Sequence, residues 1–141
     1  MSDSTPAPAK GAGLAEPTGP RALIVEDDDA IRVLASRLLC RDGYSVIQAT
    51  NGREAIDLLR VGNGVDVVVL DLALPEINGL QVIDYLRSHM PFMLNRVLIV
   101  TANVRAFRAK LPEEICHILI KPFDIHQFLA AVHTCTRNSQ N

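Results

Sequence analysis

Short apolar runs alternate with stretches of helical periodicity along most of the chain. Runs of mainly apolar or β-branched residues bounded by polar or turn-forming residues predict buried strands. The predicted strands cover residues 22–25, 44–49, 65–70, 96–100 and 116–120. The run VDVVVL at 65–70 is the most continuous, which is typical of a central strand that is covered on both faces.

Apolar residues recur three or four positions apart in the segments that follow each strand, which predicts five helices. The first helix has one apolar face and ends at Gly43; that face is formed by Ile31, Leu34, Ala35, Leu38 and Leu39. Asn51 and Asp124 are predicted N-caps of the second and the last helix, and the third helix is predicted near 80–89. The fourth has the weakest pattern, because Pro112 interrupts a short helical stretch between Thr101 and Glu114. Alternating strands and helices predict an α/β fold with a five-stranded, doubly wound parallel sheet and helices on both faces.

The length of 141 residues suits one compact domain. Residues 1–20 are rich in Pro, Ala, Gly and Ser and are predicted to form a disordered N-terminal tail. The domain is predicted at 21–137, with a C-terminal tail at 138–141. Nothing but TRNSQN follows the last helix, so a single domain without an attached DNA-binding or enzymatic output domain is expected.

Composition limits the partners and the location that the sequence suggests. A formal net charge of -2 gives no attraction for nucleic acid or an anionic membrane, so neither is an expected partner. No apolar run approaches the roughly 20 residues that span a bilayer, and no secretory signal is recognisable, so we expect a cytoplasmic location. The cysteines Cys40, Cys116 and Cys135 are odd in number and far apart, which favours reduced thiols over a disulfide framework or a zinc site.

Candidate chemistry lies at the carboxyl ends of the predicted strands, where ligands bind in such sheets. These ends carry Glu26 and Asp27, Asp71, Thr101, and Lys121. Taken singly, each residue has an ordinary structural explanation; Asp28 and Asp29, for example, suit the N-terminus of the following helix. Carboxylates brought together from two strands repel one another unless a cation or protons lie between them. Oxygen ligands with positions left for water favour Mg²⁺ over zinc.

Four motifs in this order resemble the receiver domain of two-component response regulators: LIVEDD, VVVLDLALPEINGLQVI with Asp71, Pro75 and Gly79, VLIVTA, and IKPF. The resemblance covers about 21–137 and implies the flavodoxin-like strand order 2-1-3-4-5. It implies a stand-alone phosphorelay protein that accepts a phosphoryl group from a sensor histidine kinase or a histidine phosphotransfer protein. Such a protein catalyses only its own phosphorylation and dephosphorylation. It would signal to an output protein that the sequence does not identify, or pass the phosphoryl group on. A homodimer that forms on phosphorylation is left open.

The resemblance also assigns roles to individual residues. Asp71 would be the phosphoacceptor, with Thr101 and Lys121 completing the catalytic set. Thr101, Ala102 and Lys121 would contact the phosphoryl group. Mg²⁺ would be held by Asp27, Asp71 and the carbonyl of Ala73, with Glu26 acting through water. The bond between Lys121 and Pro122 would be cis.

The sequence departs from the family pattern at one position of the conformational switch that responds to phosphorylation. In the family, the hydroxyl residue that corresponds to Thr101 is paired with an aromatic residue on the fifth strand. Ile118 occupies that position, so a rotamer switch between Thr101 and a ring is not available. We therefore hypothesise that phosphorylation orders the weakly patterned segment 104–114. Two alternatives stay open: a receiver-like docking domain that works without phosphorylation, and, less favoured, a phosphatase of the haloacid dehalogenase type. The phosphatase needs an acid two residues after its nucleophile, where this chain has Ala73.

Overall fold

The computed structural model describes residues 19–74 and 78–140. Most of the predicted N-terminal tail lies outside these residues, as does Pro75 of the second motif. The elements follow one another in this order: β1 (Arg21–Val25), α1 (Asp29–Arg41), β2 (Ser45–Ala49), α2 (Gly52–Arg60), β3 (Val67–Asp71), α3 (Gly79–His89), β4 (Val97–Thr101), β5 (His117–Ile120) and α4 (Ile125–Asn138).

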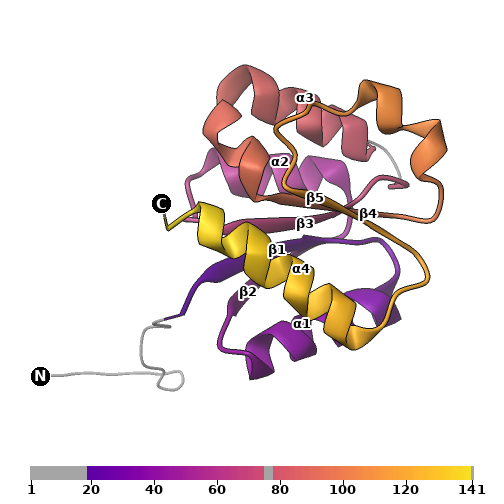
Figure 1. Cartoon of the computed structure of the whole chain (residues 1–141). Coiled ribbons are helices and arrows are strands. Elements are labelled where there is room, and N and C mark those ends of the chain that lie inside the picture. The colour runs from indigo at the N-terminus through magenta and orange to yellow at the C-terminus, as the bar shows by residue number, and fades with distance from the viewer. Residues whose placement is uncertain (1–18, 75–77, 141) are drawn as a thin grey trace, which may run out of the picture.

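The strands form one parallel sheet in the order β2-β1-β3-β4-β5, as the resemblance implied. Helices α2 and α3 cover one face of the sheet, and α1 and α4 cover the other (Figure 1). Alternate strand residues enter separate cores: Leu23 and Val25 pack beneath α2 and α3, whereas Ala22 and Ile24 face the α1 and α4 side. The predicted doubly wound α/β architecture is therefore confirmed.

Side chains at the helix N-termini fix where the helices begin. The predicted caps Asn51 and Asp124 accept hydrogen bonds from the backbone N–H groups of Glu54 (2.9 Å) and Gln127 (2.8 Å). Asp28 caps α1 in the same way by accepting from Ile31 N at 3.0 Å. Each cap satisfies one N–H group that has no partner inside its helix.

Gly79 begins α3 where the helix passes close to the end of β3. A Cβ atom at this position would lie 2.6 Å from Leu72 Cα and 2.9 Å from the carbonyl oxygen of Asp71. Only glycine allows this approach, so the residue sets the path of the chain beside Asp71.

The predicted fourth helix is not formed. The chain between β4 and β5 instead makes two 3₁₀ turns, Val104–Ala106 and Arg108–Lys110, neither of which contains a buried residue. Within the described residues the structure thus has four α-helices rather than five, and the label α4 belongs to the last one. A helix without a buried apolar face gains little from packing, and Pro112 leaves too few residues for a long one.

The expectation of reduced thiols is wrong for two of the three cysteines. Cys116 and Cys135 form a disulfide, with their Cα atoms 5.7 Å apart, and Cys40 is free and exposed. The residues are 19 positions apart in sequence. They meet because α4 runs back along the sheet, which brings its C-terminal part to the start of β5.

Candidate functional site

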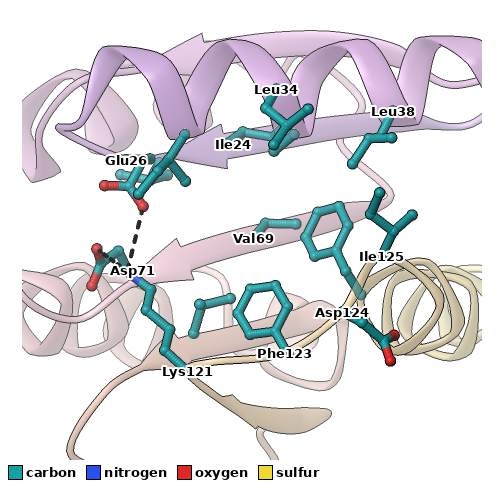
Figure 2. Close-up of a pocket in the computed structure, with 15 residues that line it drawn as sticks. Ile24, Glu26, Leu34, Leu38, Val69, Asp71, Lys121, Phe123, Asp124 and Ile125 are labelled. Atoms are coloured by element: carbon teal, nitrogen blue, oxygen red, sulfur yellow. Dashed lines mark hydrogen bonds and ion pairs between the residues drawn. The ribbon is translucent and has the colours of Figure 1, made fainter.

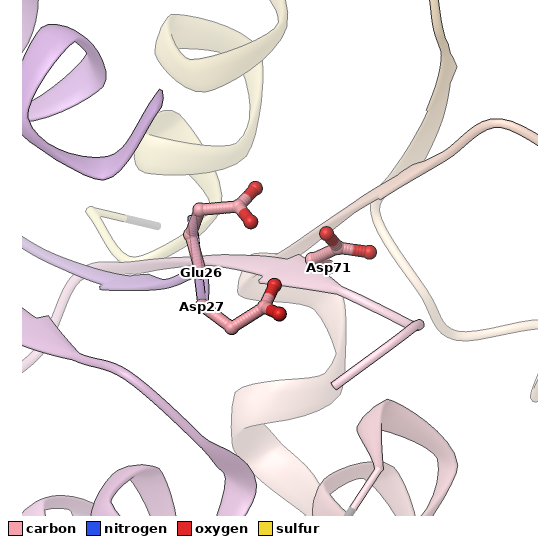
Figure 3. Close-up of side chains that lie close together, drawn as sticks. All are labelled: Glu26, Asp27 and Asp71. Carbon is pink, nitrogen blue, oxygen red and sulfur yellow. The ribbon is translucent and has the colours of Figure 1, made fainter. Parts of the chain in front are cut away.

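Three acidic side chains converge at the carboxyl edge of the sheet, as the strand ends predicted (Figure 3). Glu26 and Asp27 follow β1, and Asp71 is the last residue of β3. One carboxylate oxygen from each lies within 4.8 Å of the others. Glu26 and Asp71 are each only 6% exposed, whereas Asp27 is exposed to solvent. The group is therefore open on one side and desolvated on the other.

Lys121 lies directly after β5 and faces two of these acids (Figure 2). Its Nζ atom is 3.4 Å from Asp71 Oδ2 and 3.8 Å from Glu26 Oε1. The backbone N–H of Lys121 donates to the carbonyl of Thr101 at 2.9 Å, which extends the pairing of β4 and β5 to the site. The peptide bond between Lys121 and Pro122 is cis.

Glu26 has the most perturbed acid–base chemistry of the site. The pKa of its carboxyl group is raised from 4.5 to about 7, mainly because the group is buried and also because the negative charge of Asp71 lies nearby. The hydrogen bond from the backbone N–H of Asp28 and the positive charge of Lys121 act in the opposite direction. A cation placed between Glu26 and Asp71 would remove the cost of keeping both carboxylates ionised.

Backbone groups hold the remaining site residues in place. Asp71 Oδ1 accepts a hydrogen bond from the N–H of Ala73 at 2.9 Å. Thr101 is 3% exposed, and its hydroxyl oxygen accepts from the N–H of Asn103 at 3.2 Å. Ala102, between them, is exposed. Thr101, Ala102 and Ala73 therefore occupy the ends of β3 and β4 beside the acidic group.

Ile118, at the expected switch position, lies on β5 and faces the core beneath α2 and α3. It is half-buried and packs against this core, as do Phe107, Leu111 and Ile115 of the segment between β4 and β5. The side chain at the expected switch position thus belongs to the packing of that segment.

Two features around the site are not predicted by the sequence patterns. Arg32, on α1, donates to the carbonyl of Glu26 at 3.0 Å and to Asp29 Oδ1 at 2.6 Å, which ties the acidic turn to the helix. An apolar cleft of about 140 Å³ opens between α1 and α4 and reaches Asp71 and Lys121 (Figure 2). Its rim includes Ile31 and Leu34, which are 45% and 55% exposed rather than buried as their helical spacing suggested.

Comparison with known proteins agrees with this geometry. The family model described as the response regulator receiver domain matches residues 22–133. Response regulator MprA of Mycolicibacterium vanbaalenii is 37% identical over 119 residues, which cover 84% of this chain and 51% of MprA. The chain therefore spans about half the length of the curated relatives it matches.

Solved structures show the same fold. The non-phosphorylated HemR receiver domain from Leptospira biflexa has a TM-score of 0.74 at 30% identity, over 84% of this chain and 94% of that one. Response regulator protein TrrA from Thermotoga maritima, in complex with Mg²⁺-BeF, has a TM-score of 0.72 at 28% identity, over 83% and 99%. In the part of the chain that the structure describes, no helix is both long and apolar enough to cross a membrane.

Proposed function

The chain belongs to the family of response regulator receiver domains, and we propose that Asp71 is its phosphoacceptor in a Mg²⁺-dependent phosphorelay. The family places the chain in two-component signalling, in which a receiver domain is not an enzyme in the usual sense. The observation that carries the proposal is the placement of Asp71 between two further acids and the ammonium group of Lys121.

The proposed reaction needs little covalent chemistry from the protein beyond the nucleophile. A carboxylate oxygen of Asp71 attacks the phosphorus atom of the donor, and the bond from phosphorus to the leaving group breaks. The electron pair of that bond departs with the leaving group, which is the histidine imidazole of a kinase or phosphotransfer protein. Lys121, 3.4 Å from Asp71, neutralises negative charge on the phosphoryl oxygens. The hydroxyl of Thr101 and the backbone N–H of Ala102 are proposed to donate to the same oxygens.

The residues present fit a divalent cation. Carboxylate oxygens from Glu26, Asp27 and Asp71 lie within 4.8 Å of one another, and hard oxygen donors are the ligands that Mg²⁺ prefers. Asp27, Asp71 and the carbonyl of Ala73 would hold the ion, with Glu26 acting through water. When bound, Mg²⁺ supplies positive charge that offsets the repulsion between the carboxylates and the incoming phosphoryl group.

The downstream step is proposed to be partner binding or transfer of the phosphoryl group to a histidine phosphotransfer protein. No nucleic acid and no membrane is required for either route, and a cytoplasmic setting would give access to a sensor kinase. Dimerisation on phosphorylation is a further route to test. In this proposal the chain catalyses only its own phosphorylation and dephosphorylation.

Incubation with acetyl phosphate, followed by intact-mass spectrometry, tests the proposal. We expect a gain of one phosphoryl group that requires Mg²⁺ and disappears in the Asp71→Asn variant. Asp57→Asn is the matched control, because Asp57 is exposed on α2 and pairs only with Arg60 among the described residues. Equal labelling of Asp71→Asn and the parent would contradict the proposal. A folded parent that accepts no phosphoryl group from acetyl phosphate or from a histidine phosphotransfer protein would favour the docking domain.

A further inference from the structure

The disulfide between Cys116 and Cys135 links the start of β5 to the C-terminal part of α4. Cys116 immediately precedes β5, and Cys135 lies in the C-terminal part of α4. Their Cα separation of 5.7 Å lies within the usual range of about 4.4–6.8 Å for disulfides. The disulfide can therefore form and break without a change in the backbone positions of the two cysteines.

The segment enclosed by this disulfide contains Lys121. It runs from Cys116 through β5, the turn with Lys121 and the cap Asp124, and then along α4 to Cys135. Lys121 is the cation that faces Asp71 and Glu26. The disulfide therefore limits the freedom of the segment on which the proposed phosphoryl transfer depends.

The two cysteine residues differ in their exposure to solvent. Cys135 is 0% exposed and packs in the core with Phe128 and Val132, whereas Cys116 is half-buried. Attack by a thiol from solution is therefore expected at Cys116 rather than at the fully buried Cys135. Asn138 donates to the sulfur of Cys116 at 3.6 Å.

Several non-covalent contacts hold α4 in place without the disulfide. The hydroxyl groups of Tyr44 and Thr136 are hydrogen-bonded at 2.7 Å, and Ser139 Oγ donates to Asp66 Oδ1 at 3.0 Å. The N–H of Cys116 donates to the carbonyl of Val97 at 3.1 Å. None of these contacts involves the disulfide itself, so we expect the reduced chain to keep its fold while it loses the covalent link between β5 and α4.

We propose that Cys116 and Cys135 form a redox-active pair whose reduction by a cellular dithiol slows phosphorylation of Asp71. This inference rests on the proposed function. A thiolate of the dithiol attacks Cys116 Sγ, the disulfide breaks, and Cys135 Sγ leaves with the electron pair and takes up a proton. The second thiol of the reductant then resolves the mixed disulfide and releases Cys116. The protein disulfide becomes two thiols, and the dithiol is oxidised to its disulfide.

The test uses the 141-residue chain carrying Cys40→Ser, which removes the exposed third thiol, and compares its oxidised and dithiothreitol-reduced forms. Thiol alkylation and intact mass establish the state of the pair. Phosphorylation by acetyl phosphate and hydrogen exchange of 117–124 are then measured. The control combines Cys40→Ser with Cys116→Ser, which leaves Cys135 without a partner.

Oxidation is expected to speed phosphorylation by about three- to tenfold, since a looser positioning group lowers the rate of transfer. It is also expected to slow exchange in 117–124 and to raise the melting temperature by roughly 10 °C. The control variant should show the same phosphorylation rate, exchange and melting temperature under oxidising and reducing conditions. These values should match those of the reduced protein. Equal, measurable phosphorylation rates in the two states, or failure of the pair to oxidise, would overturn the inference. If neither state is phosphorylated, the proposed function fails, and the exchange measurement alone decides whether the pair controls the segment.

Discussion

At the scale of single residues, the site is a balance between burial and charge. Glu26 and Asp71 are both withdrawn from solvent, and only Lys121 offsets them among the described side chains. Because of this arrangement the pKa of Glu26 is raised to about 7, so its carboxyl group is partly protonated near neutral pH when no metal is bound. At higher pH both carboxylates of the metal-free site are ionised, and their burial and mutual repulsion destabilise the folded protein. A bound cation would offset this cost.

This balance predicts how stability depends on pH in the absence of Mg²⁺. The pKa of Glu26 rises from 4.5 to about 7 on folding, so the protonated form favours the folded state. The resulting stability is complete below pH 4.5 and is lost as the pH rises through about 7. Glu26→Gln imitates the protonated form, so we expect it to raise the free energy of unfolding by about 2 kcal/mol at pH 8 and to have little effect at pH 4. Urea unfolding in EDTA measures both values.

Glu54 provides a control of opposite sign. Hydrogen bonds from the N–H and hydroxyl of Thr50 lower the pKa of its carboxyl group. Its contribution to stability is present above its unfolded pKa and is lost as the pH falls through the folded pKa. Glu54→Gln should therefore destabilise the protein at pH 8, where Glu26→Gln stabilises it. A Glu26→Gln effect that is equal at pH 4 and pH 8 would contradict the assignment of the raised pKa.

At the scale of elements, the strands and caps could be predicted because local signals agree with the final packing. The run VDVVVL becomes the central strand β3, and Asn51 and Asp124 cap their helices. Features that depend on where elements meet could not be predicted. Ile31 and Leu34 have core-like spacing, yet they line a cleft because α4 does not close over them.

The disulfide and the absence of the predicted fourth helix are two further features that depend on tertiary structure and could not be predicted from the sequence. Cys116 and Cys135 meet only through the path of α4, which their spacing of 19 residues does not reveal. The segment after β4 carried a weak helical pattern, and tertiary packing supplies no buried face to support it.

The 3₁₀ turns at 104–106 and 108–110 are expected to become ordered on phosphorylation. Few backbone hydrogen bonds hold these turns. In the first, the N–H of Phe107 donates to the carbonyl of Val104 at 3.1 Å, and in the second, the N–H of Lys110 donates to the carbonyl of Phe107 at 2.8 Å. Addition of Mg²⁺ and beryllofluoride, a phosphoryl mimic, should slow hydrogen exchange in 104–111 by about tenfold or more. Helix α3 serves as an internal reference whose exchange should not change. Unaltered exchange in 104–111 would contradict this switch.

At the scale of the whole molecule, parallel strands bring chemistry from distant parts of the chain to one edge. The pairing registers align Val25 with Leu70, Asp71 with Val100, and Thr101 with Ile120. The acids, the hydroxyl and the ammonium group therefore meet although they lie up to 95 positions apart, from Glu26 to Lys121. This convergence made the candidate site predictable from the strand ends, whereas its burial and its neighbouring cleft depend on helix placement.

The most direct test of the central claim is to map the phosphorylated residue. Borohydride reduces an aspartyl phosphate to homoserine, which peptide mass spectrometry then locates in the sequence. After incubation with acetyl phosphate and Mg²⁺, we predict homoserine at position 71, and none when EDTA replaces Mg²⁺. Homoserine at Asp27 or at any other acid in place of Asp71 would contradict the account.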